Sequence, residues 1–248
     1  MTLEQFFAEN REVAIAFSGG VDSAYLLYAA TRYAARAKAY YVSTAFQPEF
    51  ELADARRLAD ELGADMLVLH VDVLMSGAVV ANPPDRCYHC KNTLFRQILR
   101  AAENDGFPVL LDGTNASDDA GDRPGMRALR ELSVRSPLRE CGLTKAEIRR
   151  LSREAGLFTW DKPAYACLAT RIRTGEEITL QKLKQTEKAE GFLFGLGFRD
   201  FRVRMVGNTA KLELRGADLP LLLENREKIV TELRKDYDSV LLNLEVRK

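Results

Sequence analysis

The stretch AFSGGVDS, residues 16–23, decides the fold that this sequence predicts. It overlaps the end of the apolar run VAIAF at 13–17, which is typical of a strand buried on both faces of a parallel sheet. The residues that follow, 22–36, carry apolar side chains at helical spacing. Gly19 and Gly20 lie between this strand and the helix, so the backbone can approach an anion closely, where the helix offers unpaired N–H groups and the positive end of its dipole. The sequence therefore predicts a loop that binds phosphate.

This loop differs from two other common phosphate-binding motifs. No Gly-Lys-Ser/Thr follows it, as the Walker A motif requires, and it lacks the G-x-G-x-x-G spacing of dinucleotide-binding folds. The alternative interpretation is an ordinary glycine-rich turn between a strand and a helix. The hydroxyl and carboxylate groups of Ser18, Asp22 and Ser23 beside the glycines favour phosphate binding over that alternative.

The same order of strand and helix repeats along most of the chain. Expected strands at AYYVST, DMLVLHVD and FPVLLDGTN alternate with expected helices at 49–63, 91–105 and 143–156. This alternation indicates right-handed βαβ units and an α/β fold with a doubly wound parallel sheet. After residue 172 the pattern changes to helix, hairpin, helix and strand, which predicts a small α+β domain. We therefore expect a main domain at 1–172 and a small substrate-binding or oligomerisation domain at 173–248.

Composition narrows the possible functions. The chain has 248 residues, and no apolar run approaches the roughly 20 residues of a membrane span. We expect a cytoplasmic protein with no membrane partner. Lys and Arg total 36 and Asp and Glu also total 36, a balance that argues against a broad nucleic-acid-binding surface.

Two of the four cysteines form a C-x-x-C pair within RCYHCK at 86–91. In a reducing compartment such a pair is more often a metal, cluster or catalytic site than a structural disulfide. Thiolates suit both zinc and iron–sulfur clusters. The residues therefore leave several interpretations open: an iron–sulfur cluster, a zinc site completed by Cys141 or His89, a redox-active Cys87–Cys90 pair, or plain buried thiols.

Other short motifs accompany the phosphate loop, namely DGTNASDD at 112–119, RPG at 123–125, SPL at 136–138 and KPAYACLATR at 162–171. SGGVDS after a first strand resembles the signature of the PP-loop ATP pyrophosphatases. Together with KPAYACLATR it resembles the LarE family, the ATP-dependent sulfur transferases that make the nickel-pincer nucleotide cofactor of lactate racemase. The resemblance implies a PP-loop fold, similar to the adenine nucleotide alpha hydrolases, and cleavage of ATP to AMP and pyrophosphate.

The resemblance also implies a substrate and a set of site residues. The substrate would be a small-molecule nucleotide, pyridinium-3,5-biscarboxylic acid mononucleotide, whose carboxylates are adenylated and then converted to thiocarboxylates. ATP and Mg²⁺ would be held by Ser18, Gly19, Gly20, Asp22, Ser23, Thr44 and Gly113. Arginine forks suit phosphate and carboxylate groups. The implied substrate-binding residues are Arg123, Arg202, Arg204 and Glu190, and the implied catalytic residues are Cys167, Asp22 and Arg171.

The family has two branches, which differ in the source of sulfur. In one branch the cysteine of the ACL motif, here Cys167, gives up its own sulfur and becomes dehydroalanine. In the other branch three cysteines hold a [4Fe-4S] cluster and leave one iron position open. The additional C-x-x-C pair resembles the cluster branch, so we expect one cluster bound by Cys87, Cys90 and Cys167. The resemblance further implies a homo-oligomer.

Three other functions remain open from the sequence. A PP-loop tRNA thiolase can also combine an adenylating loop with cysteines, but it would be expected to have a basic RNA-binding surface. An amide-forming PP-loop synthetase would leave the cysteines without a role. A nucleotide-binding regulator with a structural zinc would release no pyrophosphate with any candidate acid.

Overall fold

The computed structural model describes residues 1–118 and 124–247, and these residues form two compact units. The first unit comprises Met1–Val73 and Asp85–Ala164, and the second comprises Leu74–Pro84 and the chain from Tyr165 onward. The sequence places a domain boundary after residue 172, whereas the compact units divide between Ala164 and Tyr165. The assignment of separate functional roles to two domains stays a prediction.

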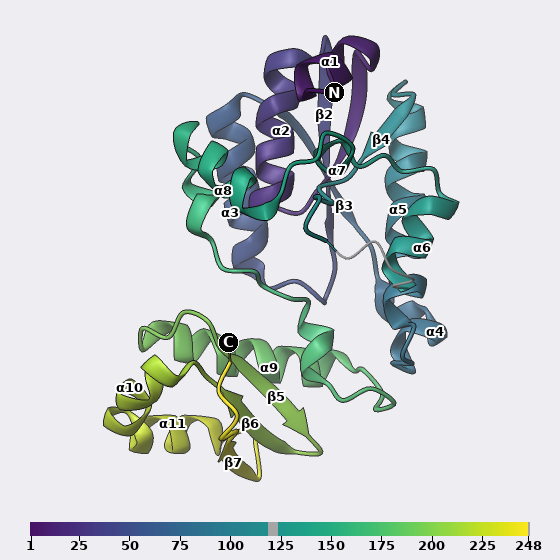
Figure 1. Cartoon of the computed structure of the whole chain (residues 1–248). Coiled ribbons are helices and arrows are strands. Elements are labelled where there is room, and N and C mark those ends of the chain that lie inside the picture. Colours follow the sequence, from purple (N-terminus) through teal and green to yellow (C-terminus); the bar gives the residue numbers. More distant parts are fainter. Residues whose placement is uncertain (119–123, 248) are drawn as a thin grey trace. The chain divides into compact units, whose positions relative to one another are not determined.

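The first unit contains a four-stranded sheet with helices on both faces (Figure 1). Its strands are β1 Glu12–Phe17, β2 Arg36–Ser43, β3 Asp65–His70 and β4 Val109–Leu111. Its helices are α1 Leu3–Glu9, α2 Val21–Tyr33, α3 Glu49–Leu62, α5 Arg86–Asn104, α6 Pro124–Glu131, α7 Pro137–Glu140 and α8 Lys145–Glu154. Short 3₁₀ helices cover Val73–Met75, at the point where the chain leaves this unit, and Phe158–Asp161.

The sheet has the order β3-β2-β1-β4, and every neighbouring pair is parallel. β1 lies inside the sheet, and its alternate side chains enter two different cores. Val13 and Ile15 pack with α2 and its neighbours, whereas Ala14 packs with Ile98 of α5 on the opposite face. Burial on both faces explains the apolar run that the sequence shows here. The structure thus confirms the predicted doubly wound α/β fold.

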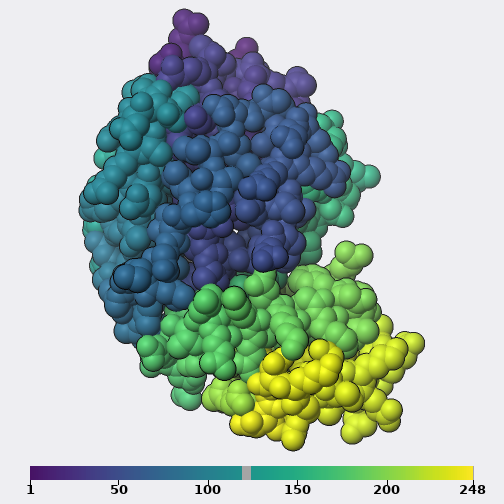
Figure 2. Space-filling model, turned by 180° about the vertical axis from the view of Figure 1, so that it is seen from behind, coloured from purple at the N-terminus to yellow at the C-terminus, as the bar shows by residue number. Residues whose placement is uncertain are grey.

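The second unit is a small mixed sheet covered by helices. Its strands are β5 Arg202–Val206, β6 Thr209–Glu213 and β7 Ser239–Leu242. Its helices are α4 Gly77–Val80, α9 Leu180–Gly195, α10 Leu219–Glu224 and α11 Arg226–Leu233, with 3₁₀ helices at Leu168–Arg171 and Gly216–Asp218. β5 and β6 form the predicted antiparallel hairpin, and β7 adds parallel to β6. The C-terminal residues, yellow in Figure 2, lie on the surface of this unit, where Leu244 is 87% exposed.

Residues 74–84 belong to the second unit although they are enclosed in sequence by the first. The fully buried side chain of Asn82 donates a hydrogen bond to the carbonyl oxygen of Arg173 at 2.8 Å. The N–H of Gly175 donates to the Asn82 carbonyl at 2.8 Å, and the N–H of Ile178 donates to Val80 at 2.9 Å. These bonds tie the segment to the chain that follows Cys167.

Two helices differ from the sequence expectation. α5 begins at Arg86, five residues earlier than predicted, because Pro83 and Pro84, which are excluded from a helix interior, lie directly before Asp85 at the N-cap position. The C-x-x-C pair therefore lies within a helix. The second helix that the sequence predicts after residue 172, between the hairpin and the last strand, is divided at Asn225, which ends α10 and begins α11. None of the described helices combines the length and apolar composition needed to cross a bilayer.

Candidate active site

The loop from Ser18 to Ser23 connects β1 to α2. Gly19 has a φ of 72°, which side chains rarely allow, and a Cβ at this position would lie 3.3 Å from the Cβ of Ala55. The N–H of Ser18 donates to the hydroxyl of Ser23 at 3.2 Å, and the two serine hydroxyls lie 3.0 Å apart. α2 has no side-chain cap at its N-terminus. The first N–H groups of the helix are thus available for an anion.

Asp22, in the first turn of α2, has two partners from distant parts of the chain. Its Oδ2 accepts a hydrogen bond from Lys145 Nζ at 2.5 Å, and its Oδ1 accepts one from Asn115 Nδ2 at 3.3 Å. Lys145 is the first residue of α8, and Asn115 follows β4. A carboxylate and an ammonium group therefore lie together beside the loop, and these are the groups that the metal and the phosphates of Mg–ATP require.

A second lysine reaches the same loop. Lys162 Nζ forms an ion pair with Asp54 Oδ2 at 2.6 Å and lies 3.5 Å from the carbonyl oxygen of Gly19. Sequence reasoning assigned no role to Lys145 or Lys162. One signal was present, since Lys145 opens a helix, where a positive charge opposes the helix dipole and needs another reason to be there. Lys162 is the first residue of the KPAYACLATR motif.

Gly113 brings the segment after β4 against the phosphate loop. A Cβ at this position would lie 2.9 Å from the backbone nitrogen of Ser23 and 3.1 Å from its Cα. Asp112 fixes the segment, because its carboxylate accepts hydrogen bonds from the hydroxyls of Thr114 and Ser136, each at 2.5 Å. The absence of a side chain at Gly113 therefore allows the close approach that completes one wall of the loop.

A pocket of about 150 Å³ opens next to the loop, at the carboxyl ends of β1 and β2. Its lining is mainly apolar and aromatic, with Ala16, Phe17, Ser18, Tyr40, Tyr41, Val42, Gln47, Glu51, Leu94, Phe95 and Ile98 around it. Thr44 is not among these residues, but its hydroxyl donates to Gln47 Oε1 at 2.6 Å and so holds a lining side chain. A pocket of this kind beside a phosphate loop would hold the flat, apolar base of a nucleotide.

Cys87 and Cys90 lie three residues apart in the first turns of α5, so both emerge from one side of the helix. Cys87 is exposed, and its Sγ accepts a hydrogen bond from Arg86 Nη2 at 3.8 Å. Two thiols in this arrangement can be neighbouring ligands of one metal or cluster. The third expected ligand, Cys167, belongs to the second unit. Within residues 1–118 and 124–247, no three His, Cys, Asp or Glu side chains form a group that could hold a metal ion.

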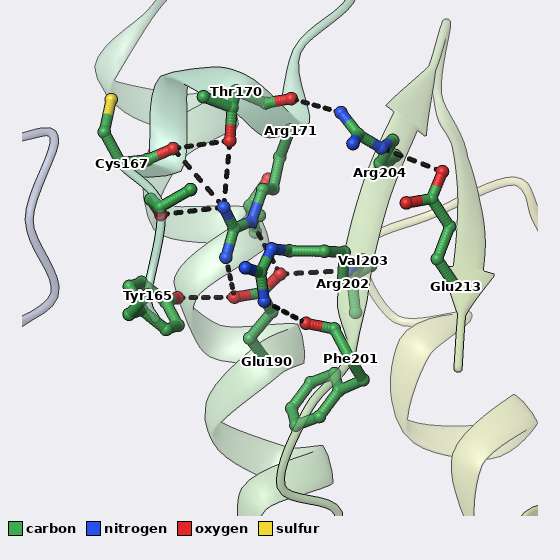
Figure 3. Close-up of polar contacts among 12 residues, drawn as sticks. Tyr165, Cys167, Thr170, Arg171, Glu190, Phe201, Arg202, Val203, Arg204 and Glu213 are labelled. Atoms are coloured by element: carbon green, nitrogen blue, oxygen red, sulfur yellow. Dashed lines mark hydrogen bonds and ion pairs between the residues drawn. The ribbon is translucent and has the colours of Figure 1, made fainter. Parts of the chain in front are cut away.

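The KPAYACLATR motif ends in a 3₁₀ turn at Leu168–Arg171, directly after Cys167. Arg171 is buried and forms an ion pair with Glu190 of α9, with 2.8 Å between Arg171 Nε and Glu190 Oε1 (Figure 3). The hydroxyl of Tyr165 also donates to Glu190. Cys141, by contrast, packs against the core of the first unit, and burial raises the pKa of its thiol.

Arg202 and Arg204 both lie on β5, where they are separated by Val203. Arg204 donates to Glu213 Oε1 at 2.8 Å and to the carbonyl oxygen of Thr170 at 2.7 Å. Arg202 is largely buried, and burial together with the positive charges of Arg171 and Arg247 lowers its pKa from the usual value. A concentration of positive charge that depresses an arginine pKa favours a bound anion. The other expected substrate residue, Arg123, lies outside the described residues.

Comparison with known proteins extends these observations. Residues 4–118, which contain the phosphate loop, match the family model described as asparagine synthase. An uncharacterised protein of Synechocystis is 39% identical over 215 residues, which cover 86% of this chain and 80% of that protein. The pyridinium-3,5-bisthiocarboxylic acid mononucleotide synthase of Lactiplantibacillus plantarum is 31% identical over 235 residues, which cover 94% of this chain and 85% of the synthase.

A more distant similarity joins the chain to RNA-modifying enzymes. The tRNA-specific 2-thiouridylase of Thermotoga petrophila is 25% identical over 188 residues, which cover 59% of this chain and 52% of the thiouridylase. The shared part is thus about half of that enzyme, whereas the synthase of Lactiplantibacillus plantarum matches across both compact units.

Proposed function

The chain belongs to the LarE family of ATP-dependent sulfur transferases, within the PP-loop superfamily, and from this premise we propose the reaction that it catalyses. The substrate is pyridinium-3,5-biscarboxylic acid mononucleotide. The enzyme adenylates its carboxylates with release of pyrophosphate and converts them to thiocarboxylates. The product class is the one named for the Lactiplantibacillus plantarum relative.

The observation that carries the proposal is the combination of groups around the phosphate loop. The N-terminus of α2 is not capped by a side chain, and Asp22 lies at 2.5 Å from Lys145 beside it. These groups suit the β and γ phosphates of Mg–ATP, whereas the neighbouring 150 Å³ pocket suits adenine. An ATP molecule in this orientation would present its α phosphorus to an acid.

Adenylation overcomes the low reactivity of a carboxylate. A carboxylate oxygen attacks the α phosphorus, the bond to the β-phosphate oxygen breaks, and pyrophosphate leaves. Lys145 and Lys162 would stabilise the negative charge that develops on the departing pyrophosphate. Sulfur then attacks the carbonyl carbon, and AMP leaves with the electron pair of the C–O bond. Arg202, in its positively charged surroundings, would hold the phosphate or the second carboxylate of the substrate.

We also propose that Cys87, Cys90 and Cys167 bind a [4Fe-4S] cluster, which would carry the transferred sulfur as an extra sulfide on its open iron position. The position of Cys87 and Cys90 on one side of a helix supports this assignment, as does the resemblance to the three-cysteine branch. The alternative is transfer of the Cys167 sulfur itself. Mass spectrometry distinguishes the two, because a cysteine that loses its sulfur as dehydroalanine becomes lighter by about 34 Da.

The test uses anaerobically purified full-length protein with ATP, Mg²⁺ and the pyridinium dicarboxylate nucleotide. We expect AMP, pyrophosphate and a thiocarboxylate product that appear together, and analysis of the same protein for iron, zinc and acid-labile sulfide to find iron and sulfide. Reactions without ATP are the control. Formation of ADP, or sulfur transfer to tRNA instead of the nucleotide, would contradict the proposed function.

A further inference from the structure

Glu190 has no acceptor position left for a ligand. The side chains of Arg171 and Glu190 are 0% and 1% exposed. Arg171 donates to both carboxylate oxygens, from Nε to Oε1 at 2.8 Å and from Nη2 to Oε2 at 2.9 Å. Oε1 also accepts the N–H of Val203 at 2.9 Å, and Oε2 accepts the hydroxyl of Tyr165. These bonds use the roughly four acceptor sites of a carboxylate, so a substrate could not bind Glu190 without breaking one of them.

The other end of the Arg171 guanidinium holds the backbone around Cys167. Nη1 donates to the carbonyl oxygen of Ala166 at 2.7 Å, and it lies 3.4 Å from the carbonyl oxygen of Cys167. The same nitrogen donates to Thr170 Oγ1 at 2.9 Å. Figure 3 shows these contacts on one side of the turn, with Cys167 Sγ directed away from them.

We propose that Arg171 and Glu190 are positioning residues, which act on sulfur transfer through the backbone of Cys167 and not through contact with the substrate. The inference rests on the proposed function and deepens it. The rigid guanidinium of Arg171 fixes the carbonyl groups on both sides of the Cys167 Cα. Glu190 fixes the guanidinium in turn, through the two hydrogen bonds that it accepts from the opposite edge. This restricts the directions that Sγ can take, and a misplacement of about 1 Å in a reacting group can cost about 100-fold in rate.

A buried ion pair is well suited to this task. Such pairs contribute little net stability compared with apolar residues of similar size, so their presence calls for another explanation. The pair here is also electrically balanced, because the positive charge beside Arg202 is opposed by Glu190 at the same place. Removal of both charges therefore changes the electrostatic surroundings of Arg202 less than removal of one.

The decisive variant is the double substitution Arg171→Met/Glu190→Gln. The glutamine keeps an oxygen that can accept the Val203 N–H, and its amide group can donate to the Tyr165 hydroxyl. The methionine fills the space of the arginine stem without leaving a buried charge. What the double variant lacks is the set of hydrogen bonds from Arg171 to the carbonyls of Ala166 and Cys167, so the variant isolates the positioning role.

The readout is the ratio of thiocarboxylate formed to pyrophosphate released. We expect pyrophosphate release to stay within about twofold of wild type while the ratio falls by about tenfold or more. The ratio falls because, when sulfur transfer is slow, water hydrolyses the adenylated substrate to the acid and AMP. A merely structural role would reduce folded protein and both products together, which leaves the ratio unchanged. The matched control is Lys188→Met, which lies on the same helix as Glu190 and breaks only the exposed ion pair of Lys188 with Asp236. This variant should keep the wild-type ratio.

A wild-type ratio in Arg171→Met/Glu190→Gln would overturn the inference, and so would a proportional loss of both products. Failure of the proposed function gives a different result, since the wild-type protein itself would then release no pyrophosphate with the acid. Arg171→Lys adds an independent measurement. A lysine keeps the charge but has no planar fork, so the ratio should again fall although the ion pair with Glu190 remains possible.

Discussion

Replacement of Gly113 by alanine should displace the phosphate loop. The new Cβ would lie 2.9 Å from the nitrogen of Ser23 and 3.1 Å from its Cα, whereas ordinary contacts begin at 3.4 Å. Both atoms are backbone atoms in the first turn of α2, so they cannot rotate away as a flexible side chain would. The loop and the segment after β4 must separate by about half an ångström, and overpacking of this kind costs about 1–3 kcal/mol in the free energy of unfolding.

Two assays measure the consequence. Urea unfolding of Gly113→Ala should show a lower midpoint with an unchanged slope, and pyrophosphate release should slow by about 10–100-fold because Ser23 and Asp22 no longer meet the phosphates correctly. Gly195→Ala is the control, since a Cβ there has no neighbour within 4 Å and the position lies near the exposed end of α9. If Gly113→Ala keeps both the wild-type midpoint and the wild-type rate, the close approach of Gly113 to α2 does not determine the loop geometry.

The other predictions concern charge and sulfur. Asp22→Ala should abolish the release of AMP and pyrophosphate while the circular dichroism spectrum stays native, since the substitution removes a metal and phosphate contact from a preformed loop; unchanged release would refute the assignment of the loop. Lys145→Met should slow pyrophosphate release by about 100-fold, as loss of one group that stabilises a developing charge does, whereas Lys145→Arg should keep most of it; equal rates in both variants would exclude a role for this positive charge. Cys141→Ala should retain brown absorbance and sulfur transfer, and both should be lost when alanine replaces any one of the proposed cluster ligands Cys87, Cys90 and Cys167. Sulfur transfer by iron-free protein, with Cys167 about 34 Da lighter afterwards, would instead establish the sacrificial mechanism.

The phosphate loop could be predicted because its signals are local. An apolar strand, two glycines and a helix with Asp22 in its first turn occupy adjacent positions in the sequence, and periodicity alone places them in order. The start of α5 was harder to predict from the sequence. The apolar spacing of this helix begins only after Cys90, whereas its first turn is defined by Pro84 and Asp85.

Contacts between distant residues could not be read in the same way. Lys145 reaches Asp22 across 123 positions, and Arg171 reaches Glu190 across 19. In a sequence each of these residues resembles a solvated charge on a helix or turn, which is what most lysines and glutamates are. The role of Glu190 becomes visible only in the structure. Its burial and its complete set of hydrogen bonds distinguish a residue that positions the backbone from one that binds a ligand.

The interrupted second unit has a consequence for how the protein is made. A ribosome releases residues 74–84 long before it adds the carbonyl acceptors of the Asn82 side chain, on Ile172 and Arg173, which lie 90 and 91 positions later. The nascent chain can therefore complete the parallel sheet of the first unit before residues 74–84 have any of their hydrogen-bond partners from the second unit. An expressed fragment that starts at Tyr165 would lack the segment altogether, and it should fold only when a peptide of residues 74–84 is supplied in trans or joined to it by a linker.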